Sequence, residues 1–84
     1  MKLLELMSRK IKLIWDFRGP DGLKTAEHHC VHLKEYTARE KLTFHEINVQ
    51  QLSEYHSIAY VIVDEKEMLT YRDALKPHRG AVAP

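Results

Sequence analysis

The sequence has little cysteine, few chain-breaking residues and no long apolar run. Cys30 is the single cysteine, so an internal disulfide is excluded. Three glycines and three prolines exclude a collagen-like or low-complexity chain. The longest apolar run, from Ile58 to Val63, has the length of a strand and falls short of the roughly 18 residues that span a bilayer. The absent disulfide therefore favours a reducing compartment, and nothing predicts a membrane segment.

What the sequence contains is typical of one small globular domain. It has 84 residues, of which 44% are hydrophobic and 30% charged. Thirteen basic and twelve acidic side chains give a net charge of +1, without the basic excess of a nucleic-acid binder. The N-terminal stretch carries Glu5 among its leucines and lacks a small-residue cleavage site, unlike a signal peptide. We expect a cytoplasmic protein that binds neither membranes nor nucleic acid.

Local patterns predict the order β-α-β-β-α. Residues 10–17 alternate between apolar and polar side chains, the period of a half-buried strand. Residues 21–41 follow the helical period, with an apolar stripe that includes Cys30 and Leu33. Strand patterns return over residues 42–49 and 57–64. Residues 68–75 fit a short helix ended by Pro77, with a hairpin strand as the alternative.

These elements predict an α+β two-layer sandwich, with helices on one face of a small mixed sheet. A right-handed crossover makes the first two strands parallel, and the third strand can return antiparallel between them. The plan is similar to a ferredoxin-like fold that lacks its last strand, a likeness of architecture that implies no function. We expect residues 1–9 to be an N-terminal extension, residues 10–76 the single domain and residues 77–84 a C-terminal tail.

Histidines on the expected helix form a candidate metal site. His28 and His32, at positions i and i+4, project from the same helix face and can chelate Zn²⁺, Ni²⁺ or Cu²⁺. Glu35, one turn further, is a candidate third ligand, whereas Cys30 belongs to the buried stripe. A structural zinc site needs four ligands, which a second subunit of a symmetric dimer could supply. A solvated polar face explains the same pattern.

A candidate anion or ligand site lies where the first strand meets the helix. Asp16 and Arg18 share a strand face, and Lys24 lies in the first turns of the helix, whose N-terminus attracts anions. The connection between them lacks the glycine spacing and Lys-Ser/Thr pair of a P-loop. A capped helix beside a surface Asp16–Arg18 pair is the simpler interpretation.

The sequence favours a non-enzymatic interaction domain that forms a homodimer and carries no cofactor. The core is thin, Ile14 lies on the face that the helices leave uncovered, and the first strand is expected to be an open edge. One alternative is a metal-binding domain that uses the helix histidines. Another is a small-molecule enzyme or sensor with a site at the dimer interface, built from Asp16, Arg18 and His45. Neither Cys30 nor the serines near His56 form a recognisable nucleophile arrangement.

Overall fold

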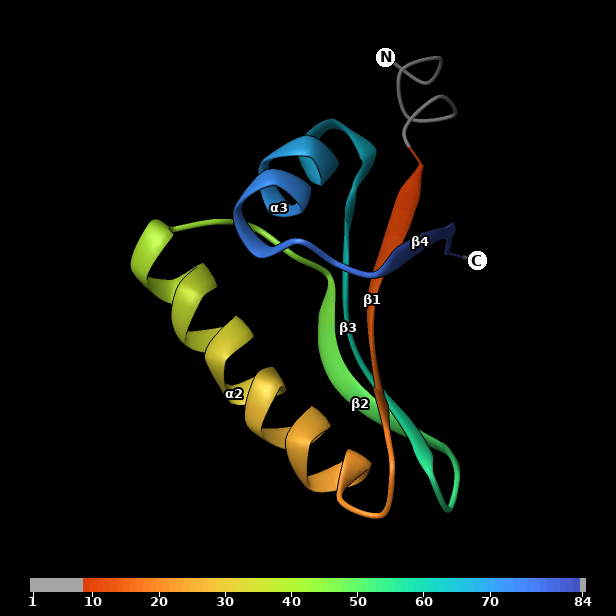
Figure 1. The fold of residues 1–84 in the computed structure, drawn as a ribbon. Helices are drawn as coiled ribbons and strands as arrows, with labels where there is room; N and C mark the ends of the chain where they lie inside the picture. The colour runs from red at the N-terminus through yellow and green to blue at the C-terminus, as the bar shows by residue number, and fades with distance from the viewer. Residues whose placement is uncertain (1–8, 84) are drawn as a thin grey trace.

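The computed structural model describes residues 9–83, in which helices cover one face of a four-stranded sheet (Figure 1). Of the expected N-terminal extension, residues 1–8 lie outside the described part. Along the chain the elements are β1 (Lys10–Arg18), α2 (Gly22–Glu40), β2 (Glu46–Ser53), β3 (His56–Asp64), the 3-10 helix η1 (Glu65–Glu67), α3 (Met68–Leu75) and β4 (Arg79–Val82).

The sheet has the strand order β2-β3-β1-β4, and all its neighbouring strands are antiparallel. As predicted, β1 and β2 run in the same direction with β3 between them. Because no two neighbouring strands are parallel, the sheet is antiparallel and not mixed as expected. The two-layer α+β fold is confirmed, and its strand order is that of a ferredoxin-like fold. Residues 68–75 form α3, which decides against the alternative hairpin strand.

The last strand of the ferredoxin-like plan, which the sequence did not predict, is present in part of the expected tail. Strand β4 pairs with β1, with Gly80 opposite Leu13. Two further backbone hydrogen bonds flank this pairing, from His78 N to Ile14 O at 2.9 Å and from Ala83 N to Lys10 O at 2.8 Å. The expectation that β1 is an edge was therefore wrong, and the edges are β2 and β4. Four residues held mainly by backbone hydrogen bonds carry too little side-chain pattern to be recognised.

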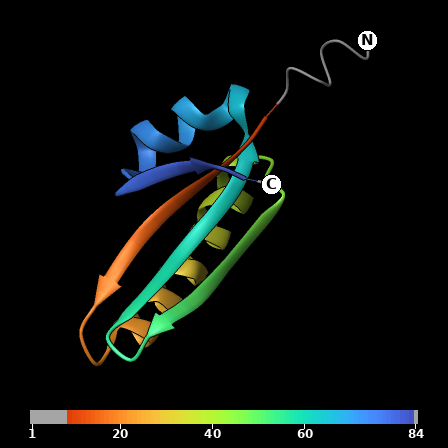
Figure 2. The same ribbon diagram turned by 90° about the vertical axis from the view of Figure 1, so that its right-hand side faces the viewer.

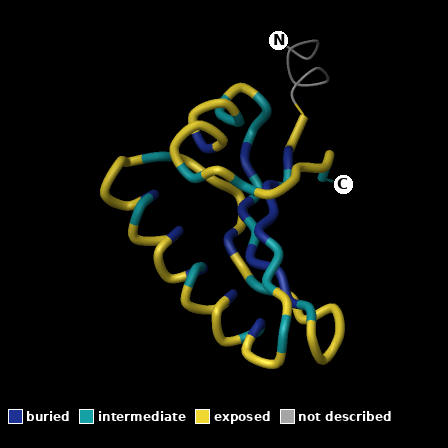
Figure 3. Tube along the Cα trace, in the orientation of Figure 1, coloured by how far each residue is buried: buried dark blue, intermediate teal, exposed yellow. Residues whose placement is uncertain are grey.

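The core lies between the sheet and the two helices. The helix α2 turns a buried stripe toward the sheet and leaves its other side exposed (Figure 3). The short helix α3 contributes Tyr71, which is fully buried and donates a hydrogen bond to the Thr43 carbonyl at 2.8 Å. The buried cluster consists of Ile11, Leu13, Trp15, Cys30, Leu33, Ile47, Val61, Val63 and Tyr71. It uses the odd-numbered positions of β1 to β3, so their even-numbered positions lie on the opposite face.

Candidate functional site

Figure 2 shows the sheet from the face on which residues 9–83 place no helix, with α2 behind the strands. We call it the open face; it is formed by the even-numbered positions of β1, β2 and β3 together with Arg79 and Ala81 of β4. At its centre, Ile14 and Ile58 are only 4% and 3% exposed. Since no helix of residues 9–83 lies over them, neighbouring side chains must shield these isoleucines.

One group of shielding side chains crosses the sheet from β1 to β2. The Lys12 ammonium lies 4.1 Å from the centroid of the Tyr60 ring, a cation–π contact. The Tyr60 hydroxyl donates a hydrogen bond of 2.6 Å to Glu46 Oε2. Burial, and then this bond to a carboxylate, raise the pKa of Tyr60 to about 12. The phenol therefore stays protonated and keeps donating at any physiological pH.

The second group centres on Asp16, which accepts hydrogen bonds from two strands. Arg79 Nε donates to Oδ2 at 2.9 Å, and Arg79 Nη2 donates to Oδ1 at 3.0 Å. His56 Nε2 lies 2.7 Å from Oδ1, and both of these side chains are less than one-fifth exposed. The Arg79 bonds, with His56 adding to them against the effect of burial, hold the pKa of Asp16 well below its usual range. The cluster is an ionised carboxylate clamped between a guanidinium and an imidazole.

In the structure, Asp16 of the expected anion site pairs with a residue outside the predicted set. Arg18 lies on the same face as Asp16, but the ionic partner of Asp16 is Arg79 from β4. Lys24 is exposed on α2, and within residues 9–83 neither it nor Arg18 makes an ion pair. His45 lies apart from this cluster, with its Nε2 2.7 Å from Asp64 Oδ1.

Sequence reasoning missed His56 and Arg79. The sequence indicated no role for His56 beside its neighbouring serines, yet Asp16 orients it from a neighbouring strand. Ser57, next to it, is buried on the helix-covered face and cannot share a site with it. The contact of His56 with Asp16 follows from the register of β1 against β3, which places Arg18 opposite His56. The pattern of a single strand does not reveal that register.

On the exposed side of α2, His28 and His32 point their ring nitrogens at each other. Their Nε2 atoms are 2.9 Å apart, and the rings meet edge to face. Glu35 Oε1 lies 3.5 Å from His32 Nδ1, the ring nitrogen that does not face His28. Within the described part of the chain no group of three or more His, Cys, Asp and Glu side chains could hold a metal ion.

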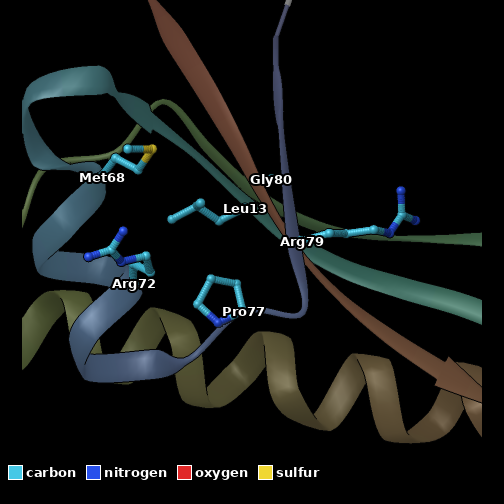
Figure 4. A pocket seen from close by; sticks show the side chains of 6 residues that line it. All are labelled: Leu13, Met68, Arg72, Pro77, Arg79 and Gly80. Carbon is cyan, nitrogen blue, oxygen red and sulfur yellow. The ribbon is translucent and has the colours of Figure 1, made fainter.

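A shallow apolar groove runs between α3 and β4 (Figure 4). Its volume is about 200 Å³, and Leu13, Met68 and Pro77 contribute to its wall. Arg79 borders it, but its guanidinium points away toward the open face, where it binds Asp16. A small-molecule site usually combines such a cavity with several converging polar groups. Among the residues that line this groove, Arg72 is the only charged one whose side chain lies on the groove side of the sheet.

His29 is the helix histidine that faces the core. Its ring centroid lies 4.8 Å from that of Trp15 and 5.5 Å from that of Phe17. Its Nε2 is buried and has no hydrogen-bond partner among residues 9–83. Burial, together with the nearby histidines His32, His78 and His28, lowers the pKa of this ring.

We expect His29 to make the domain less stable as the pH falls below about 6.5, the ordinary histidine pKa. Below that value the unfolded chain binds a proton that the folded ring resists, so acidification favours unfolding. The variant His29→Phe keeps an aromatic ring against Trp15 and removes both the titration and the unpartnered nitrogen. Urea unfolding at pH 7.5 and 5.5 should show a smaller loss of stability in the variant. An equal loss in both proteins would assign the effect to other groups.

Comparison with protein families, with curated proteins and with solved structures finds no match to this chain. The fold gives the class, a small α+β domain, and any function has to be argued from its surfaces. Within residues 9–83 no helix is both long enough and apolar enough to cross a membrane.

Proposed function

We propose that the protein is a non-enzymatic interaction domain that forms a homodimer through the open face of its sheet. The observation that carries the proposal is an apolar centre, Ile14 and Ile58, that within the described part of the chain only neighbouring side chains cover, flanked by half-buried Tyr60 and Ile62. Two such faces pack on each other at about 10 Å in β-sandwiches, with their side chains interdigitating. A second copy would complete on this face the cover that the helices provide on the other.

The open face divides into two halves of opposite charge. The basic half, formed by β1 and β4, carries four cations and the carboxylate of Asp16. The acidic half, formed by β3 and β2, carries two carboxylates and no Lys or Arg at its strand positions. The cations are Lys10, Lys12, Arg18 and Arg79, and the carboxylates of the acidic half are Glu46 and Asp64.

This division makes the face complementary to itself. A two-fold axis parallel to the strands places the β1–β4 side of one copy over the β2–β3 side of the other. Lys12, Ile62 and Glu46 lie at one level of the sheet, so Lys12 of each copy approaches Glu46 of its partner. Opposite charges around an apolar centre set the register and exclude the arrangement that places basic half on basic half.

Charge reversal on either half tests this geometry. In Lys12→Glu two acidic groups meet at each contact, and in Glu46→Lys two basic groups meet, so each variant alone should sediment as a monomer. An equimolar mixture should recover the dimer, because both contacts of the mixed pair join opposite charges. Recovery in the mixture separates attraction between chains from the Lys12–Tyr60–Glu46 contacts within one chain.

The matched control is Lys34→Glu, the same charge reversal on the exposed side of α2. It should leave the dimer intact in sedimentation equilibrium at micromolar concentration. A monomeric wild-type protein under these conditions would overturn the proposal. Equal weakening by Lys34→Glu would instead assign association to net charge, and the absence of a mixed dimer would reject the proposed axis.

A further inference from the structure

We propose that His28 and His32 form a binding site for one Ni²⁺ or Cu²⁺ ion on the outer side of α2, and that Glu35 is its positioning residue. The two Nε2 atoms converge from successive helical turns to within 2.9 Å. Imidazole nitrogens are common ligands of these ions, and two on one helix bind as a chelate. This site lies on the layer opposite the open face and does not depend on the proposed dimer.

The separation of the two nitrogens favours one coordination geometry. Histidine nitrogens bind first-row divalent ions at about 2.0–2.1 Å, so nitrogens 2.9 Å apart subtend about 90° at the ion. That is the angle between adjacent ligands in the square-planar or octahedral complexes of Cu²⁺ and Ni²⁺. Tetrahedral Zn²⁺ needs a wider angle, with the nitrogens about 3.3 Å apart at the same bond lengths. From the separation observed, Ni²⁺ and Cu²⁺ require less movement of the two rings than Zn²⁺ does.

Glu35 favours the form of the His32 ring in which Nε2 has the free lone pair that a metal ion needs. Its Oε1 lies 3.5 Å from His32 Nδ1 and favours the tautomer in which Nδ1 carries the proton. His32 Nε2 is then the acceptor in the bond between the rings, and His28 Nε2 is the donor. When the ion takes the place of this bond, the proton on His28 Nε2 leaves, and the neutral ring can carry it on Nδ1. Only one of the two rings has to change its tautomer.

The site is open to solvent and incomplete by itself. The side chain of His32 is 60% exposed, and α2 turns this side away from the sheet (Figure 3). Cys30 is buried on the opposite side of the helix. Two protein nitrogens leave the other coordination positions to water. In the proposed dimer both sites face outward, so the four-histidine interface considered from the sequence does not arise from that dimer.

Calorimetric titration of the whole chain with Ni²⁺ and with Cu²⁺ at pH 7.5 tests the site. We expect one ion per chain, a weaker response to Zn²⁺, and no saturable binding in His28→Ala or His32→Ala. Glu35→Gln, which keeps the shape of the side chain, should lower the affinity by about tenfold, the smaller end of what outer-shell changes cost. The affinity for the metal ion should also decrease as the pH is lowered, because protons compete for the imidazoles.

The control is His45→Ala, which removes an exposed histidine from outside the helix and should leave binding unchanged. Far-UV circular dichroism of each variant verifies that α2 is intact. Electron paramagnetic resonance of the Cu²⁺ complex should show two coupled nitrogens both in the wild type and in His45→Ala. Absence of binding in the wild type, or unchanged binding in His32→Ala, would overturn the proposal. So would equal loss in His45→Ala.

Discussion

Replacing Trp15 with alanine is expected to lower the free energy of unfolding by about 3–5 kcal/mol. Trp15 is 3% exposed, contacts the His29 ring, and donates a hydrogen bond from Nε1 to the Leu75 carbonyl at 3.1 Å. This one side chain therefore joins β1 to both helices. A domain of this length has a total stability of roughly 4–13 kcal/mol, so the variant loses a large part of it.

The variant Trp15→Phe separates packing from the hydrogen bond. It keeps an aromatic ring in the core but leaves the last carbonyl of α3 without its donor, so we expect a smaller loss, about 1–3 kcal/mol. Both variants lack the single tryptophan, so urea unfolding should be followed by far-UV circular dichroism. A loss below about 1 kcal/mol in Trp15→Ala would mean that the two helices are held mainly by other contacts.

The fold was predictable where each element carries its own pattern. Alternation along β1 and the helical stripe of α2 depend only on near neighbours in the sequence, and both appear in the structure as expected. Strand β4 carries no such pattern and becomes a strand because β1 offers free backbone groups beside it. Its absence from the prediction also made β1 appear to be an edge.

The candidate site was less predictable because it depends on register. Asp16, His56 and Arg79 belong to three different strands, and only the observed pairing brings them together. A period of two identifies the face of each side chain but not its neighbour across the strand. In contrast, helix geometry alone places His28 and His32 on one face of α2 a turn apart, as expected. The place of Glu35 depends on which nitrogen of His32 it meets, which spacing does not determine.

Gly22→Ala is the second change expected to have a large effect, because it affects the point where α2 meets β1. A Cβ atom at Gly22 would lie 2.7 Å from the backbone oxygen of Phe17, closer than real Cβ contacts. Alanine is a better helix former than glycine by about 1 kcal/mol, which alone would make the variant more stable. The obstacle is backbone and cannot rotate away, so overpacking should prevail and cost about 1–3 kcal/mol.

The control for this change is Gly80→Ala, where the nearest atom, Leu13 Cδ2, would lie at an ordinary 3.5 Å. Its unfolding free energy should stay within about 0.5 kcal/mol of the wild type, or rise as the unfolded chain loses freedom. Since His29 lies against Trp15, a shift of α2 in Gly22→Ala should also change the fluorescence of the folded state. A more stable Gly22→Ala with unchanged fluorescence would show that helix propensity prevails and that the Gly22–Phe17 contact is relieved without a shift of α2 against β1.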